Sequence, residues 1–278
     1  TMEANPGTLE HKPLDAYRRA GINRLSLGAQ SFNPQHLAVL GRIHSPGDIE
    51  KSFASARSGG FTNINLDLMY GLPQQSVAQA MADLQQALDL GPEHVSWYQL
   101  TLEPKTEFHA KPPVLPDEDT LEAMEQGGHR LLARRDYQRY EVSAYARNGQ
   151  YSAHNLNYWS FGDYLGVGAG AHGKLTVEGQ ILRTEKPKQP RLYLSDPRTL
   201  VTRPVTREQT AEEFMLNALR LTEGVSFERL TQTTGLTLTD LQPRWQEMVT
   251  KGLVEPDRIA ATPRGYRYLD SIIAEFLV

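Results

Sequence analysis

Segments with the pattern of β-strands alternate with segments of helical periodicity through the first half of the chain. Strands are expected at residues 23–28, 63–70, 94–102 and 140–145, and helices at 14–20, 34–40, 47–57, 76–88 and 119–134. In the helix expected at 76–88, Val77, Met81 and Leu84 share one face behind a capping Ser76. Because strands that alternate with helices build parallel β/α units, the pattern predicts an α/β fold.

Polar side chains stand at the expected carboxyl ends of these strands. They are Glu3, Gln30, Asp67 and Thr101. Parallel β/α folds bind their ligands at this edge of the sheet, where the βα loops gather. Any one of these residues could instead close a turn or cap a helix. Four at equivalent positions favour a ligand site.

The sequence after Gly173 predicts a different kind of domain. A hairpin is expected at 174–184, around Glu178 and Gly179, and the proline-rich residues 186–204 have the composition of a linker. Further elements are expected in the order helix 207–221, helix 226–233, helix 239–251, hairpin 252–260 and helix 262–277. We therefore expect one domain at 1–185 and a mostly helical, winged-helix-like domain at 205–278.

Charge and hydropathy narrow the possible partners. The net charge is −4, and the helix that would enter DNA carries Asp240 and Glu247 beside Arg244 and Lys251. Without a basic surface, binding to nucleic acid is not expected. No apolar run reaches the roughly 18 residues of a membrane span, and the mean hydropathy is −0.49. We expect a cytoplasmic protein without stable membrane insertion.

The segment from His154 to Trp159 has the sequence His-Asn-Leu-Asn-Tyr-Trp, which concentrates polar groups on aromatic rings. Residues 166–173 follow with four glycines and His172. Aromatic rings with polar ends suit a flat, partly apolar ligand, and glycines allow a close approach of the backbone. A buried structural cluster of hydrogen-bonded aromatic residues is the alternative interpretation of either segment alone.

The chain starts as the end of a strand, with Thr1-Met2-Glu3-Ala4 running into a turn at Asn5-Pro6-Gly7. It has no strand body before this point and no methionine at position 1. We expect it to be a fragment of a longer protein. The sequence also has no cysteine, so it offers no thiolate ligand for zinc or an iron–sulfur cluster.

Several motifs together resemble the radical S-adenosylmethionine (SAM) proteins related to oxygen-independent coproporphyrinogen III oxidase. They are residues 3–6 (Glu-Ala-Asn-Pro), 27–32 (Leu-Gly-Ala-Gln-Ser-Phe), 41–42 (Gly-Arg), 67–73 (Asp-Leu-Met-Tyr-Gly-Leu-Pro) and 140–143 (Tyr-Glu-Val-Ser). The pattern of His154, Asn155, Tyr158 and Trp159 is similar to the motif of the heme-chaperone branch of that family. The resemblance covers essentially the whole chain.

This resemblance implies a partial (β/α) barrel that lacks its first strands. By position, Glu3, Gln30, Arg42 and Asp67 correspond to the SAM contacts of the family, with Thr101 and the glycine loop at 166–173 completing the wall. Carboxylates, an amide and a guanidinium match the hydroxyl, ammonium and carboxylate groups of SAM. For Arg42, a surface ion pair is the alternative.

Family members also hold a 4Fe-4S cluster on a Cys-x-x-x-Cys-x-x-Cys loop after the first strand. That loop and the glycine-rich loop after the second strand are absent here. The start in mid-strand is consistent with truncation, so the resemblance implies cluster ligands in the missing amino-terminal part.

The resemblance implies a heme chaperone that binds heme and transfers it to an acceptor protein. His154 is the expected iron ligand, Tyr158 and Trp159 the expected walls, and His172 a second candidate ligand. The alternative is a coproporphyrinogen III oxidase that decarboxylates its substrate by radical chemistry, because both activities share the barrel and SAM. Whether the protein is an enzyme therefore stays open. A winged-helix regulator is a third possibility, which the acidic charge balance disfavours.

Overall fold

The structure, a computed structural model, describes residues 1–7 and 14–277. The chain divides into two compact units, Thr1–Tyr151 and Ser152–Val278. The boundary therefore falls before the His154–Trp159 segment and the hairpin expected at 174–184, which we had placed in the first domain. Both elements belong to the second unit.

The first unit is built on a six-stranded sheet in the order β1-β2-β3-β4-β6-β5. Its first four strands are parallel, as expected from the alternating pattern. They are β1 (Met2–Ala4), β2 (Leu25–Gln30), β3 (Ile64–Tyr70) and β4 (His94–Gln99). The helices are α1 (Leu14–Arg19), α2 (Pro34–Val39), α3 (Pro46–Ser58), α4 (Val77–Asp89), α5 (Glu107–Ala110) and α6 (Glu118–Arg134).

Local sequence explains where these helices start. Ser45 and Ser76 each cap the following helix and form a capping box with the residue three positions later, Asp48 and Gln79 respectively. Each serine oxygen accepts a backbone N–H that would otherwise lack a partner. The expectation of Ser76 as an N-cap is confirmed.

The strand expected at 140–145 is wrong in extent and direction. The structure has two short strands there, β5 (Gln138–Arg139) and β6 (Ala144–Ala146), and β6 runs antiparallel to β4. Between them, the Arg139 guanidinium donates to the carbonyl oxygens of Glu141 and Val142, at 3.3 and 3.1 Å from Nε. These bonds hold the turn that reverses the chain.

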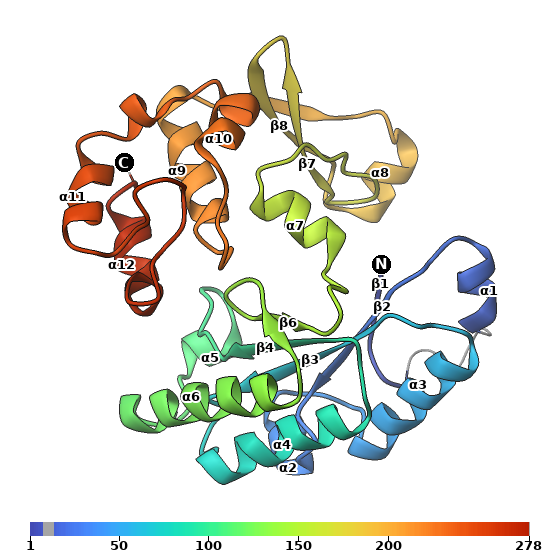
Figure 1. Cartoon of the computed structure of the whole chain (residues 1–278). Helices are drawn as coiled ribbons and strands as arrows, with labels where there is room; N and C mark the ends of the chain where they lie inside the picture. The colour runs from blue at the N-terminus through green and yellow to red at the C-terminus, as the bar shows by residue number, and fades with distance from the viewer. Residues whose placement is uncertain (8–13, 278) are drawn as a thin grey trace. The chain divides into compact units, whose positions relative to one another are not determined.

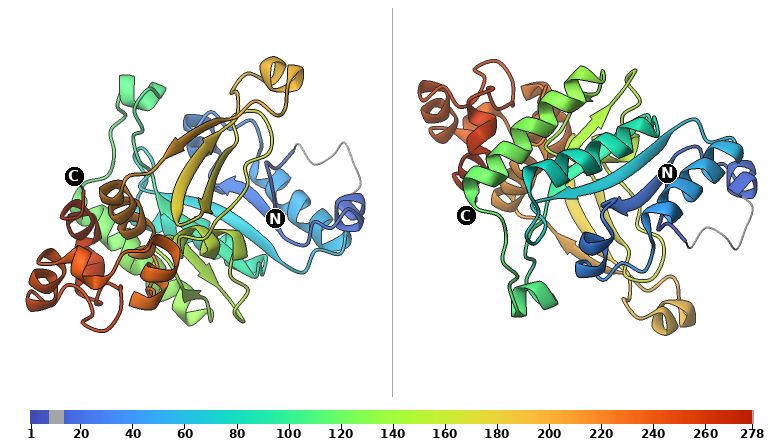
Figure 2. Two further views of the ribbon diagram at one scale, coloured as in Figure 1. Left: turned by 90° about the horizontal axis from the view of Figure 1, so that it is seen from above. Right: turned by 90° about the horizontal axis from the view of Figure 1, so that it is seen from below.

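The two faces of the parallel sheet differ in polarity. Leu27, Leu66 and Trp97 point toward the helices, where they pack in one apolar core with Leu84 and Met124. Helices α3, α4 and α6 cover this face (Figures 1 and 2). Because side chains alternate along a strand, the polar residues of β2, β3 and β4 project from the opposite face.

The second unit contains helices and a three-stranded antiparallel sheet in the order β7-β8-β9. Its first elements are α7 (Ala153–Trp159), β7 (His172–Val177), β8 (Gln180–Glu185), α8 (Pro190–Ser195) and β9 (Val201–Pro204). The hairpin around Glu178 and Gly179 is confirmed, and both residues have positive φ, +50° and +81°. Such values suit a tight hairpin turn.

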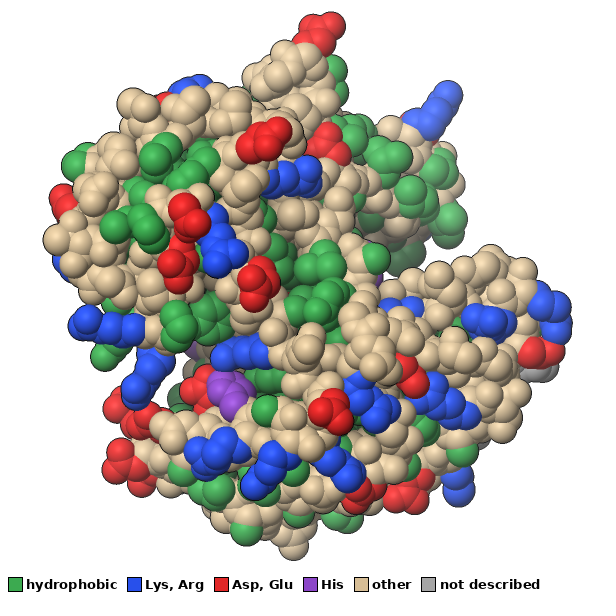
Figure 3. All heavy atoms as spheres, viewed as in Figure 1, with side chains coloured by type: hydrophobic (Ala, Val, Ile, Leu, Met, Phe, Trp, Pro, Cys, Tyr) green, Lys and Arg blue, Asp and Glu red, His purple; other side chains and the backbone are tan. Residues whose placement is uncertain are grey.

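The prediction of a linker at 186–204 is wrong, because these residues form α8 and the edge strand β9, which pairs with β8. Proline is tolerated on an edge strand since no partner needs its missing N–H. Leu192 and Leu194 of α8 and Val201 of β9 are exposed, and apolar side chains gather over this region in Figure 3.

The rest of the second unit is mostly helical, as expected. It comprises α9 (Arg207–Ala218), α10 (Phe227–Thr234), the 3-10 turn Leu238–Leu241, α11 (Arg244–Thr250), the 3-10 turn Gly265–Tyr268 and α12 (Leu269–Ala274). The single helix expected at 239–251 is wrong, because Pro243 interrupts it. In the region of the small hairpin, Val254 bridges Ala261. Among the described residues, no helix is both long and apolar enough to cross a membrane.

Candidate functional site

The face of the first unit's sheet opposite the helices carries a row of polar side chains. Glu3 of β1 lies beside Ser26 of β2, Ser26 beside Asn65 of β3, and Asn65 beside His94 of β4. One step further along the strands, Asp67 lies beside Ser96. Parallel pairing in register therefore brings residues that are far apart in sequence onto one surface.

Asp67 is held at the centre of this surface. Its carboxylate accepts hydrogen bonds from the Ser26 hydroxyl at 3.1 Å and the Asn65 amide at 2.8 Å. Burial raises the pKa of Asp67 although these hydrogen bonds act in the opposite direction, and the negative charge of Glu3 adds a smaller increase. The arrangement leaves a desolvated acceptor ready for a hydroxyl or ammonium group.

The bonds around Asp67 continue into a buried network. Asn65 Oδ1 faces His94 Nδ1 at 2.6 Å, and His94 Nε2 faces the Tyr140 hydroxyl at 2.8 Å. His94 and Asn65 are almost completely buried. Because the Asn65 amide oxygen can only accept, His94 Nδ1 donates to it, and the network fixes the orientation of the Asn65 amide that supports Asp67.

Gln30 ends β2 in a left-handed conformation, with φ +67°. The Tyr98 hydroxyl donates to Gln30 Oε1 at 2.8 Å. Gly28 makes room for this side chain, since a Cβ atom there would lie 2.9 Å from Gln30 Nε2 and 3.1 Å from Asn5 Oδ1. Arg42 donates to the same Asn5 oxygen at 3.1 Å. Asn5 thus links the neighbourhoods of Gln30 and Arg42.

The surroundings of the Tyr98 hydroxyl show that Gln30, Arg42 and Asp67 lie close to one another. Burial, together with a smaller effect of the charge of Asp67, raises the pKa of the Tyr98 hydroxyl to about 12, and Arg42 acts in the opposite direction. Glu3, Gln30, Arg42 and Asp67 therefore share one surface. Thr101 lies two residues beyond β4 and is exposed, and its contact with SAM stays a prediction.

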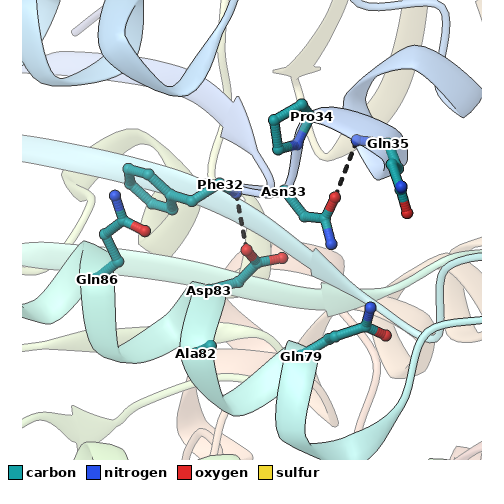
Figure 4. Close-up of a pocket in the computed structure, with 8 residues that line it drawn as sticks. All are labelled: Phe32, Asn33, Pro34, Gln35, Gln79, Ala82, Asp83 and Gln86. Atoms are coloured by element: carbon teal, nitrogen blue, oxygen red, sulfur yellow. Dashed lines mark hydrogen bonds between the residues drawn. The ribbon is translucent and has the colours of Figure 1, made fainter.

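The turn after Gln30 is anchored by Asp83 of α4. Its carboxylate accepts from the Ser31 hydroxyl at 2.6 Å and the Phe32 amide at 2.8 Å. The pair of Phe32 and Asp83 lines a shallow pocket on the helical side, together with amide side chains such as Gln79 and Gln86 (Figure 4). Left-handed backbone at a residue other than glycine is strained, so these bonds stabilise the turn that directs Gln30.

Replacing Asp83 with alanine should release this turn. The Ser31 hydroxyl and Phe32 N–H would lose a buried acceptor, so we expect the first unit to lose about 2 kcal/mol of its free energy of unfolding. Urea unfolding of the variant measures this loss. Asp89→Ala, an exposed change near the end of the same helix, is the control; equal losses in the two variants would contradict the role of Asp83.

In the second unit, the aromatic segment forms helix α7. His154 Nδ1 lies 3.1 Å from the Ser152 hydroxyl oxygen, and its ring meets Tyr158 edge-on at 6.0 Å between centroids. Tyr158 in turn packs against Tyr164 at 4.7 Å. The Tyr164 hydroxyl accepts from Arg183 at 3.0 Å. The ring of His154 thus packs against Tyr158, and Tyr164 and Arg183 in turn support Tyr158.

Trp159 ends α7 beside a cation. The Arg220 guanidinium carbon lies 4.3 Å from the centroid of the Trp159 ring. The indole nitrogen of Trp159 is buried and has no hydrogen-bond partner among the residues that the structure describes. A guanidinium over an aromatic face provides a mixed apolar and cationic surface. Asn155 is half-buried on the same helix.

The glycine loop packs mainly against its own strand. A Cβ atom at Gly166 would lie 2.3 Å from the His172 carbonyl oxygen, and one at Gly173 would lie 2.5 Å from Thr184 Oγ1. Close backbone packing within the second unit therefore accounts for these two glycines. His172 is exposed at the start of β7, opposite Glu185.

Sequence reasoning missed several residues of these two surfaces. Asn65, Ser96 and Tyr98 alternate with apolar residues inside strands, and that alternation was the available signal. Tyr164 had no such signal, because its partner Arg183 is distant in sequence.

The parallel sheet and its polar face fit a radical SAM protein. Residues 1–87 match the radical SAM superfamily, and residues 205–268 match the HemN C-terminal domain. The solved structure of coproporphyrinogen III oxidase (HemN) from Escherichia coli, a radical SAM enzyme, has a TM-score of 0.77 to this chain. That similarity covers 99% of this chain and 68% of HemN, at 22% identity, and it establishes the fold.

Relatives of known sequence identify the family more narrowly. The heme chaperone HemW of Escherichia coli is 45% identical over 100% of this chain and 74% of its own length. HemW of Haemophilus influenzae is 42% identical over 100% of this chain and 73% of its own length. HemW of Bacillus subtilis is 36% identical over 99% and 75%, respectively. The chain belongs to the HemW family, and the resemblance described from the sequence is confirmed.

Proposed function

We propose that this protein is a heme chaperone, which binds heme at helix α7 and passes it to an acceptor protein. The observation that carries the proposal is the state of α7: His154, Tyr158 and Trp159 lie on a helix with no buried residue. Aromatic side chains that only fill a core would be buried there. The names of the HemW relatives, described as heme chaperones, support the same function.

Each residue of α7 has a role in this proposal. Ser152 orients His154 through Nδ1, and Nε2 is the ring atom that we assign to the heme iron. Tyr158 and Trp159 form apolar walls. Arg220, over the Trp159 ring, supplies positive charge for a propionate. His172 is the second candidate ligand, and Asn155 a polar contact at the edge of the site.

The first unit fits SAM as a ligand. Glu3 and Asp67 would accept hydrogen bonds from ribose hydroxyls or the ammonium group, and Arg42 would pair with the carboxylate. Gln30 and Thr101 would complete the contacts with polar atoms of the ligand. When held on a reduced iron–sulfur cluster, SAM supplies a 5′-deoxyadenosyl radical. A cluster held by cysteine thiolates has no ligand among these 278 residues, so we assign only SAM binding to this chain.

A heme titration followed by visible absorbance tests the proposed function. We expect stoichiometric binding with a shifted Soret band, and about tenfold or greater weakening, with a changed band, in His154→Ala. His172→Ala is compared with it, because His172 is the second candidate ligand and an exposed histidine of the same unit. An unchanged spectrum in His154→Ala with a changed one in His172→Ala would transfer the iron ligand to His172.

Product analysis separates the chaperone from the oxidase alternative. Assayed in a form that carries a 4Fe-4S cluster, the protein should leave coproporphyrinogen III unchanged and release heme to an apo-hemoprotein. Formation of vinyl groups from propionates would instead establish the oxidase. We place heme transfer in the cytoplasm.

A further inference from the structure

The position of helix α7 is not fixed by burial of its own side chains. It has seven residues, none of them buried, and its N-cap Ser152 makes no side-chain capping bond. Helices this short are unstable by themselves in water. The direction of its side chains must therefore depend on contacts around the helix, including those at its carboxyl end.

A buried cation lies at that end. The side chain of Lys174, in β7, is only 2% exposed. Its Nζ donates to the Phe161 carbonyl at 3.2 Å and to Asp163 Oδ1 at 2.7 Å, and it lies 4.3 Å from the centroid of the Phe161 ring. Burial lowers the pKa of Lys174, although Asp163 acts in the opposite direction. Burying a charge is costly even when it is paired, and neither unit's ligand chemistry uses this one.

Asp163 connects the cation to a fixed frame. Its carboxylate also accepts from the Thr176 backbone N–H at 2.7 Å and the Thr176 hydroxyl at 2.9 Å. Partial burial raises the pKa of Asp163, but the bonds from Lys174 and Thr176 outweigh this effect and lower it overall. The carboxylate is therefore ionised at neutral pH. It joins the loop to β7 by accepting hydrogen bonds from three donors of that strand.

The same loop is joined to α7. The Asn157 amide donates to the Asp163 carbonyl at 3.0 Å, and the Gly162 N–H donates to the Asn157 carbonyl at 2.7 Å. Gly162 permits this contact, because a Cβ atom there would lie 2.0 Å from Asn157 Oδ1. Arg229 adds a second cation at the helix end, donating to the Ser160 carbonyl at 2.8 Å. Cations are favourable at this end of a helix.

We propose that Lys174 is a positioning residue for the heme site, which fixes the last turn of α7 through Phe161 and Asp163. The inference rests on the proposed function for its effect on heme. It assigns Lys174 no contact with heme. A residue that only filled the core would affect the stability of the whole second unit and leave the geometry of α7 unchanged.

Lys174→Met tests this role, because methionine keeps an unbranched apolar side chain and removes the charge. We expect faster hydrogen exchange of the α7 amides, with those of α9 unchanged. We also expect heme affinity to fall about tenfold, with an altered Soret band. Met248→Ala, in the core of the same unit, is the control for lost stability and should preserve α7 protection and the heme spectrum.

Asp163→Asn provides a second test if Lys174→Met does not fold, since it keeps the shape and removes the partner charge; α7 should again exchange faster and heme affinity should fall. Unchanged α7 protection in the folded variant would overturn the inference, as would faster exchange with unchanged heme binding. If the wild-type chain does not bind heme, the proposed function fails and so does the role of Lys174 in heme binding. Hydrogen exchange then still decides whether Lys174 fixes α7.

Discussion

Replacing Gly128 with alanine should severely destabilise the first unit. Gly128 lies in α6 against the indole ring of Trp97 in β4, and a Cβ atom there would be 1.9 Å from a ring carbon. Trp97 is 2% exposed and cannot move aside without disturbing the core. We expect a loss of about 3 kcal/mol in the free energy of unfolding of this unit, measured by urea unfolding.

Gly127→Ala is a matched control in the same helix. A Cβ atom at Gly127 would meet only the flexible Met81 side chain, with its sulfur at 3.0 Å. Because alanine favours the helix over glycine by about 1 kcal/mol, this variant should equal or exceed the wild type in stability. Equal destabilisation by both changes would show that helix α6 tolerates no side chain there and that Trp97 is not the cause.

Asp67→Asn should make the first unit more stable at neutral pH while weakening SAM binding. The unfolded carboxyl titrates near its ordinary value of about 3.9, and burial raises the pKa in the folded protein. Between these two values the folded state binds more protons than the unfolded state. The stability contribution of Asp67 is therefore fully present below the unfolded pKa and is lost as pH rises through the folded pKa. Asparagine is neutral and removes this loss.

Thermal unfolding of the wild type and Asp67→Asn as a function of pH measures the effect. The variant should have the higher melting temperature near neutral pH, and the difference should shrink toward about pH 4. Asp240→Asn should behave oppositely, because bonds from the Thr237 backbone and Arg207 lower the pKa of Asp240 to about 2. Its contribution is present above the unfolded pKa and lost as pH falls toward about 2. Lower stability of Asp67→Asn near neutral pH would contradict our account of Asp67.

The elements that could be predicted from the sequence are those whose pattern is local. Periodicity located α4, the regular succession of strands and helices located β3 and α6, and Ser76 marked a helix start. The proline-rich segment that became β9 was not predictable, because its pairing with β8 depends on tertiary contacts. The reversal at Arg139 depends on hydrogen bonds from a side chain to the backbone, which no periodicity records.

The same distinction applies to the site. Glu3, Gln30 and Asp67 could be found because parallel strands bring their carboxyl ends to one edge of the sheet. Tyr98 could not, because its role depends on the turn that places Gln30 beside it. In the sequence, nothing distinguished Lys174 from an ordinary lysine on the surface. Its burial follows from the packing of β7 against the loop at 161–163.

The second unit's core extends beyond the segment that matches the HemN C-terminal domain. Phe161 and Ile181, which precede residue 205, pack with Phe214 and the other core residues of this unit. Removing these two side chains would expose the apolar residues that they cover to solvent. A protease that cut at residues 204–205 and released the preceding segment would thus leave an incompletely folded remnant. The compact unit that contains these residues begins at Ser152. We therefore expect a fragment that folds on its own to include helix α7 as well as the helical region.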